Sequence, residues 1–211
     1  MPDLPLRLGV DVGSATDLVK SAESARVALT RPADRNLLHV SKLELLYELA
    51  FLRAFVSWET FLEDSFLRYM CGYTTVHGQA ALAGSASYST TIRAARLALY
   101  AGQDYLLWHN PDKIVRRSQR IFSSGKHEMV VASIRGTLSQ FAAVRHRIAH
   151  GQTHARLEFD LATMSLAGRR YAGSRPGRFL RDWVPGLTPP TRWLYSITSD
   201  LLSLSRQICP T

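Results

Sequence analysis

Residues 34–71 read DRNLLHVSKLELLYELAFLRAFVSWETFLEDSFLRYMC and contain neither glycine nor proline. Apolar side chains recur here at intervals of three and four residues, the spacing of one face of an α-helix. They are Phe51, Phe55, Trp58, Leu62, Phe66 and Tyr69. Gly72 follows in the position where glycine commonly ends a helix. The stretch therefore predicts one very long helix, or two in tandem, at the centre of a helical protein.

Further helices are predicted on both sides of this stretch. Residues 1–14 hold two prolines and two glycines and are predicted to form an irregular leader. The other helices are predicted over 15–29, over 90–101, after Asn110-Pro111, over 126–150 and over 192–208. Proline suits the first turn of a helix because its missing N–H has no helical partner there.

One segment breaks the helical pattern. Residues 157–166, LEFDLATMSL, alternate in polarity and predict a strand. The Gly-, Pro- and Arg-rich stretch that follows predicts a loop with one short strand. The expected fold is therefore an all-α helical bundle with a small β and loop appendage near residues 157–184.

The length of 211 residues fits one domain. We expect three consecutive segments within it: a leader and short helix over 1–33, a helical core over 34–155, and the appendage with a closing helix over 156–211. Neither Cys71 nor Cys209 has a CxxC partner, so the sequence indicates no metal knuckle or disulfide framework and predicts reduced thiols. The N-terminus lacks the pattern of a signal peptide, and charged residues interrupt every apolar run before it reaches about 20 residues. We expect a soluble, cytoplasmic protein that does not enter a membrane.

The formal net charge is +9, which favours polyanionic partners, nucleic acid first and anionic membrane surfaces second. A merely basic surface is the alternative. Two clusters are candidates for phosphate contacts. The first comprises Lys113, Arg116, Arg117 and Arg120; the second comprises Arg169, Arg170, Arg175, Arg178 and Arg181, with Phe179 and Trp183 as candidates for base stacking or for anchoring the loop. Charge clusters of this kind are otherwise solvated surface.

Arg145 occupies an apolar pattern. Residues at three-and-four spacing on the helix predicted over 126–150 are Val130, Ile134, Leu138, Phe141, Arg145 and Ile148. A guanidinium keeps its proton, and burying it unpaired costs several kcal/mol, so it requires an anionic partner. Glu59 lies about 40° from Phe55 on the helical wheel and is one candidate. A purely structural salt bridge and a catalytic pair both remain open.

His150 is the last residue before Gly151 and lies about 140° around an ideal helix from Arg145. The two side chains then converge only if the helix end is distorted, or if a second subunit completes the site. A solvated histidine at the end of the helix is one alternative. A zinc site is another, since His146, His150 and His154 follow at intervals of four, although Gly151 is expected to end the helix before His154.

The segment from Phe141 to Gly151, FAAVRHRIAHG, resembles the signature of HEPN domains: an arginine, a polar residue, three further positions and a histidine. Its ending is similar to the RiboL-PSP and MAE-type branches of that superfamily. Residues 57–63, SWETFLE, resemble the helix that faces the signature there. The resemblance covers roughly residues 36–155.

This resemblance implies a metal-independent RNA endonuclease, dimeric, which leaves 2′,3′-cyclic phosphate ends and needs no cofactor. His150 would be the general acid or base, Arg145 the group that stabilises the scissile phosphate, His146 a supporting polar residue, and Glu59 the residue that orients Arg145. Arg147 joins the expected RNA-binding residues. A toxin or phage-defence effector with an antitoxin or sensor partner fits this pattern. The tyrosine that follows the histidine in one toxin branch is absent, so regulation by its modification is not expected.

Two other functions remain open. A HEPN-type domain that binds RNA or a nucleotide without cleaving it would use the same residues. A helical oligomerisation protein would use the Arg145–Glu59 pair for stability alone.

Overall fold

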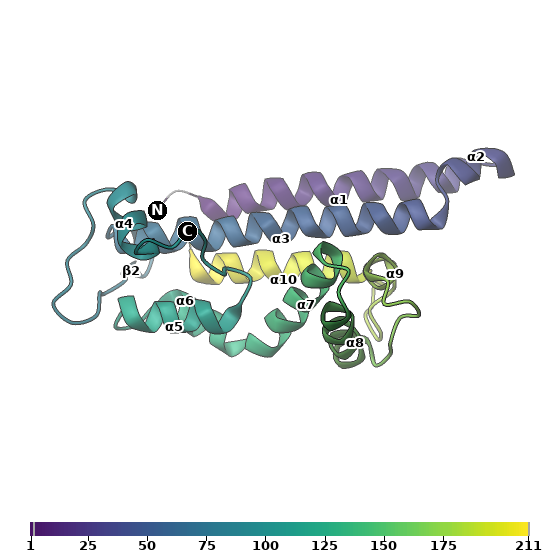
Figure 1. Cartoon of the computed structure of the whole chain (residues 1–211). Helices are drawn as coiled ribbons and strands as arrows, with labels where there is room; N and C mark the ends of the chain where they lie inside the picture. Colours follow the sequence, from purple (N-terminus) through teal and green to yellow (C-terminus); the bar gives the residue numbers. More distant parts are fainter. Residues whose placement is uncertain (2, 211) are drawn as a thin grey trace. The chain divides into compact units, whose positions relative to one another are not determined.

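The computed structural model describes Met1 and residues 3–210, and helices dominate it (Figure 1). The helices are α1 (Leu4–Ala28), α2 (Pro32–Leu37), α3 (Val40–Met70), α4 (Ile92–Tyr100), α5 (Pro111–Ile121), α6 (Lys126–Ser133), α7 (Arg135–Ala149), α8 (Thr153–Ala167), α9 (Pro176–Arg181) and α10 (Trp193–Ile208). The strands β1 (Thr74–Thr75) and β2 (Gly78–Gln79) form an antiparallel pair. The predicted all-α class with a small β element is confirmed.

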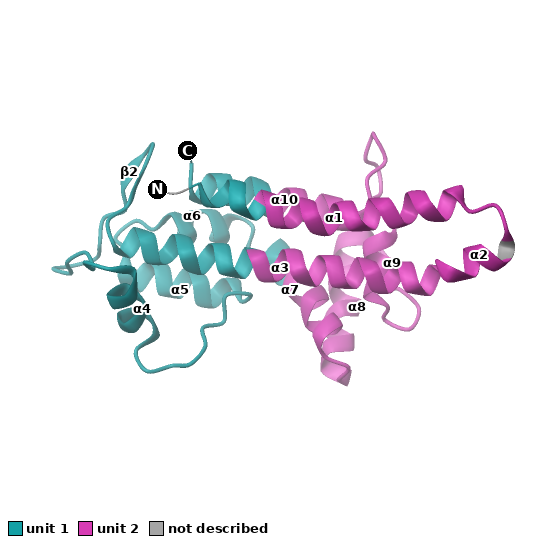
Figure 2. Cartoon of the chain, turned by 90° about the horizontal axis from the view of Figure 1, so that it is seen from above, with its two compact units in different colours: residues 1–8, 58–139, 201–211 teal, residues 9–57, 140–200 magenta. Residues whose placement is uncertain are grey.

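The chain divides into two compact units, which Figure 2 shows in different colours. Unit 1 contains residues 1–8, 58–139 and 201–211, and unit 2 contains residues 9–57 and 140–200. Each unit is thus assembled from segments that are distant in the sequence. The three consecutive segments expected from the sequence are a different division, and they stay a prediction.

The core of unit 1 is built around the second half of α3. Phe66 is fully buried, and its ring lies 5.5 Å from that of Trp108 and 5.1 Å from that of Phe122, both edge to face. The ring of His127 lies 4.9 Å from it on another side. This confirms the apolar face predicted for the helix, and it shows that an imidazole has been enclosed among aromatic rings.

The core of unit 2 is formed where α1 and the first half of α3 lie side by side (Figures 1 and 2). Phe51 and Phe55 of α3 are buried there with Val19 of α1. Phe179 of α9 is also fully buried, and its ring stacks 5.1 Å from that of Trp193. Phe179 therefore anchors its segment to the core, which was one of the two roles expected for it.

The N-terminal segment differs from the prediction, because α1 begins at Leu4 and leaves no irregular leader over 1–14. Its buried residues recur at helical spacing and are Leu4, Leu8, Val12, Ala15 and Val19. Each glycine inside a helix costs about 1 kcal/mol, whereas burying one large apolar side chain contributes about 1.5–3 kcal/mol. The apolar period therefore outweighs the two glycines, and Pro5 lies in the first turn, where proline is tolerated.

The predicted strand over 157–166 is also wrong, because α8 covers this segment. Its buried residues are Ala155, Phe159, Ala162 and Thr163, the period of a helix, and they outweigh the short alternation in the sequence. The two strands of the protein lie instead at 74–79. Beyond α8, the short strand predicted in the loop is reduced to a single bridge between Trp183 and Arg192.

The helix predicted over 126–150 is divided into α6 and α7 at Ile134, whose φ of −126° and ψ of 25° interrupt the helix. Other boundaries agree with the prediction. The Asn110 side chain accepts a hydrogen bond from the Lys113 N–H at 3.1 Å and caps α5, and Gly72 follows α3 with a φ of +74°. In the part of the chain that is described, no helix has both the length and the apolar character needed to cross a bilayer.

Candidate active site

The C-terminal half of α7, in unit 2, carries the residues of the predicted signature. Phe141 and Val144 are fully buried, whereas Arg145 and Ile148 are half-buried. Val144 rather than Arg145 therefore continues the buried stripe, and Arg145 lies at its border. The helix ends at Ala149, and the His150 N–H still donates to the His146 carbonyl at 2.9 Å.

Three histidines and one carboxylate meet where α7 gives way to α8. The His146 Nδ1 lies 2.7 Å from Glu158 Oε2, and the His154 Nε2 lies 3.0 Å from Glu158 Oε1. The ring centroids of His146 and His150 are 4.9 Å apart, with the planes at 76°. We call His146, His150, His154 and Glu158 the histidine cluster. It lies wholly in unit 2.

The local sequence explains this arrangement. His150 directly follows α7 and lies one helical turn after His146, and its N–H still donates to the His146 carbonyl, so the two side chains lie on the same side. Residues 150–152 separate α7 from α8, with Gly151 at the break as expected, and Glu158 follows His154 by one turn of α8. Glu158 was missed because its segment was predicted as a strand, in which His154 and Glu158 would not have been neighbours. A helical reading of 153–167 would have placed them together.

Glu158 determines which nitrogen of His146 is available for chemistry. A carboxylate only accepts hydrogen bonds, so the Nδ1 of His146 donates to it. In the neutral ring the Nε2 then carries the lone pair and is the free basic position. The side chains of both groups are about one-third exposed, 34% for His146 and 38% for Glu158. The pair is therefore held by a hydrogen bond and still reachable from solvent.

Arg147 has internal partners. Its Nε donates to the Ser174 carbonyl at 3.1 Å, and its Nη1 donates to the His150 carbonyl at 3.1 Å. Ser174 in turn donates to Asp160 of α8 at 2.9 Å. These bonds tie the end of α7 to the loop that follows α8. Arg147, expected to bind RNA, is thus positioned to hold the backbone at His150 in place.

Glu59, the expected partner of Arg145, belongs to unit 1. It is buried, 8% exposed, and its Oε2 accepts a hydrogen bond from the Tyr105 hydroxyl at 3.4 Å. Its Oε1 lies 3.8 Å from the Nδ1 of His109. The pairing of Glu59 with Arg145 stays a prediction.

The basic residues of α5 belong to unit 1 and differ in their surroundings. Lys113, Arg116 and Arg120 are exposed, which suits contacts to a phosphate backbone. Arg117 is half-buried, with its guanidinium 4.4 Å from the centre of the Trp108 ring. Burial, together with the charge of Arg120, lowers the pKa of Arg117 from its ordinary value. Arg117 therefore packs against the core, and its contact with RNA stays a prediction.

The zinc alternative requires several ligands gathered around one point. Among the described residues, 1 and 3–210, no group of three or more His, Cys, Asp or Glu side chains is arranged to hold a metal ion. Cys71 and Cys209 are free thiols. In comparisons with protein-family models, curated proteins and solved structures, nothing matched this chain.

Proposed function

We propose that this protein is a metal-independent RNA endonuclease whose active centre is the histidine cluster. The observation that carries the proposal is the chain of contacts from Glu158 to His146 and on to His150, in which a carboxylate orients one imidazole and a second imidazole lies 4.9 Å away. The resemblance of Arg145-His146-x3-His150-Gly151 to the HEPN signature is a second, independent support.

The reaction needs only groups that this cluster offers. RNA supplies its own nucleophile, the 2′-hydroxyl. The Nε2 of one imidazole takes the 2′-hydroxyl proton while the oxygen attacks phosphorus, and the second imidazole, in its protonated form, gives a proton to the departing 5′-oxygen. The P–O5′ bond breaks, which leaves a 2′,3′-cyclic phosphate and a 5′-hydroxyl end.

We assign the base to His146 and the acid to His150, with Arg145 stabilising the charge that develops on the phosphorane. Glu158 favours this assignment because it leaves the lone pair of His146 on Nε2. Arg147 is a positioning residue that holds the His150 carbonyl. The net charge of +9 favours binding of a polyanion such as RNA, and Lys113, Arg116 and Arg120, which are exposed in unit 1, are candidates for backbone contacts of their own.

A homodimer in the cytoplasm, a toxin or phage-defence role, and an antitoxin or sensor partner rest on the resemblance alone. The runner-up function, a non-catalytic domain that binds RNA or a nucleotide, uses the same residues. The non-catalytic function predicts that the protein binds RNA but forms no cleavage products.

The test is cleavage of a generic RNA in EDTA, with the new ends identified by mass. We expect cyclic phosphate ends from the wild type and a loss of rate of about 10²–10⁴-fold in His146→Ala and in His150→Ala. Glu158→Gln keeps a weaker acceptor for Nδ1, and its rate should fall about tenfold to a hundredfold. His77→Ala is the matched control, because His77 is an exposed histidine of unit 1 outside the cluster. Its rate should equal that of the wild type.

Two results would overturn the proposal. Cleavage by both histidine variants at the rate of the wild type would exclude the cluster as the active centre. Binding of RNA by every variant and by the wild type, without any cleavage, would leave the non-catalytic domain as the function.

A further inference from the structure

Unit 2 contains a second feature that RNA cleavage does not use, a cavity of about 620 Å³. This volume lies within the range of about 300–1,000 Å³ that small-molecule sites occupy. Five arginines line it: Arg169, Arg175, Arg178, Arg181 and Arg192. Four of them belong to the segment that the sequence singled out as a basic loop. We call this feature the arginine pocket.

The arginines are gathered by the fold of this segment. Arg178 and Arg181 are close to one turn apart on α9, and Arg175 directly precedes that helix. The bridge between Trp183 and Arg192 brings the start of α10 alongside. The arginines therefore converge in a defined structure, whereas the sequence alone suggested loose contacts along a loop.

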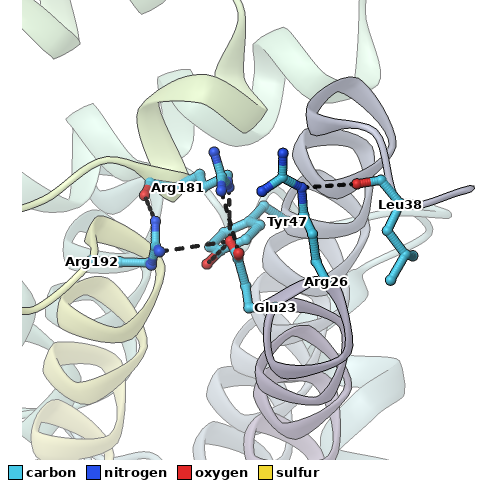
Figure 3. Close-up of polar contacts among 6 residues, drawn as sticks. All are labelled: Glu23, Arg26, Leu38, Tyr47, Arg181 and Arg192. Atoms are coloured by element: carbon cyan, nitrogen blue, oxygen red, sulfur yellow. Dashed lines mark hydrogen bonds and ion pairs between the residues drawn. The ribbon is translucent and has the colours of Figure 1, made fainter. Parts of the chain in front are cut away.

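Glu23 of α1 holds two of the arginines (Figure 3). Its Oε1 lies 2.7 Å from the Nε of Arg181 and 3.7 Å from Nη2 of Arg192, and it accepts a hydrogen bond from the Tyr47 hydroxyl at 3.1 Å. Burial by itself raises the pKa of Glu23, but the hydrogen bond and charge of Arg181 and the charge of Arg192 outweigh it, so the pKa lies below its ordinary value. Glu23 is therefore a carboxylate anion in the folded protein at neutral pH.

Two further carboxylates contact two of the three remaining arginines. Glu44, which is buried, pairs with Arg175, and Asp182 pairs with Arg169. Arg178 is exposed and contacts no carboxylate among the residues that the structure describes. The lining thus holds five guanidinium groups and two carboxylates, Glu44 and Asp182, and with Glu23 and Glu48 beside them the positive charges still outnumber the negative ones.

A phosphomonoester is a ligand whose negative charge balances the excess positive charge of the pocket. At neutral pH it carries about −1.5 to −2 charges, whereas a phosphodiester inside a nucleic acid carries one. Guanidinium groups bind phosphate oxygens in pairs through parallel N–H donors. Trp183 lines the pocket and is half exposed, and the Arg192 guanidinium lies 4.4 Å from its ring centre. Its ring offers a stacking surface for an aromatic ring attached to the phosphate. We propose that the arginine pocket binds a phosphomonoester that carries an aromatic ring, either as a free small molecule or at the end of an RNA chain.

The experiment measures binding by calorimetry at low salt, with adenosine 5′-monophosphate as the probe. Adenosine 3′,5′-cyclic monophosphate keeps the ring but is a diester with one charge, and adenosine has no charge. We expect the monophosphate to bind, the cyclic diester to bind at least about tenfold more weakly, and adenosine not to bind. Equal affinity for the monophosphate and the cyclic diester would overturn the proposal, as would no binding of the monophosphate.

Arg178 and Arg170 provide a matched pair of variants. Arg170 is exposed on the same segment but does not line the pocket. Arg178→Gln should raise the Kd of the monophosphate about tenfold, and Arg170→Gln should leave it unchanged. Equal effects of the two substitutions would mean that general charge, and not the pocket, attracts the ligand.

Two further measurements are needed. The first distinguishes an RNA end from a free small molecule as the ligand, and the second separates binding at the arginine pocket from RNA cleavage at the histidine cluster. An RNA oligonucleotide with a 5′-phosphate is compared with the same chain ending in a 5′-hydroxyl; preference for the phosphorylated chain assigns the pocket to RNA ends, and equal binding assigns it to a free ligand. Binding of adenosine 5′-monophosphate is repeated in His150→Ala. Since this variant removes only the proposed acid, the pocket should bind as in the wild type even if RNA is never cleaved.

Discussion

At the scale of single residues, burial decides what an ionisable side chain does, and the histidines of this protein illustrate it. His146 and His150 lie where solvent reaches them, in unit 2, whereas His127 lies fully buried in unit 1. The Nε2 of His127 is 2.8 Å from the Ser65 hydroxyl. Burial, reinforced by the charge of Arg117, lowers the pKa of His127 to about 3. This imidazole is therefore a neutral part of the core.

His127 makes stability depend on pH. The unfolded chain takes up a proton below about pH 6.5, and the folded protein does so only near pH 3, so the free energy of unfolding falls as the pH is lowered through this window. The contribution is up to about 1.4 kcal/mol per pH unit. His127→Gln should lose this part of the slope in denaturant unfolding between pH 6.5 and 4. An unchanged slope would show that His127 is not the group responsible, and His77→Ala, which alters an exposed histidine, is the control.

Single residues also show which parts of the core and of the candidate sites could be predicted from the sequence. The three-and-four spacing of apolar residues correctly predicted that Trp58, Phe66 and Tyr69 are buried. This prediction succeeded because the buried face of a single helix is visible in a short stretch of sequence. The importance of Glu158 was missed because a short polar–apolar alternation outweighed the helical period in the prediction. The pairs Glu23–Arg181 and Glu44–Arg175 join residues 158 and 131 positions apart, and no local pattern signals them. The resemblance singled out His146 and His150, but Glu158, the carboxylate partner of His146, was identified only from the fold.

At the scale of secondary-structure elements, α9 packs directly onto α3. A Cβ added to Gly177 would lie 2.2 Å from the backbone oxygen of Glu44, and the Gly177 N–H donates to Glu48 at 2.8 Å. A glycine is therefore required for this approach. The contact sets the position of α9, and with it the positions of Arg178 and Arg181 in the arginine pocket.

Gly177→Ala should destabilise the protein by about 1–3 kcal/mol, because the backbone of α3 must shift to admit the methyl group. Gly13→Ala is the matched control in the same unit. Gly13 lies inside α1 with open space around its Cα, so alanine there should stabilise the protein by about 0.5–1 kcal/mol. Denaturant unfolding of both variants measures the difference. Equal stability of the two would contradict the close packing of α9 on α3.

At the scale of the whole molecule, α10 contributes to both units. Leu194 and Ile197 are buried in unit 2, and Leu201 and Ile208 are buried in unit 1. Each such side chain contributes about 1.5–3 kcal/mol by its burial, and a typical domain is stable by only about 5–15 kcal/mol. One helix is thus necessary for the stability of each unit.

A chain that ends at residue 190 lacks α10 and Arg192, and it should show no cooperative thermal transition by circular dichroism. Its Glu23 would also lose one of its two arginine partners. Arg206→Ala changes only an exposed side chain of the same helix, and it should unfold with the cooperativity of the full chain. A cooperative transition in the shortened chain, in either unit, would show that α10 is dispensable there.

The assembly of each unit from distant segments has a consequence for the order of events on the ribosome. Both units need residues of α1, which are synthesised early, and residues of α10, which are synthesised late. Both units therefore lack the buried side chains of α10 until residues 193–208 have been made. Neither unit can be complete before residues 193–208 have been synthesised, and the arginine pocket cannot be complete before Arg192 has been added.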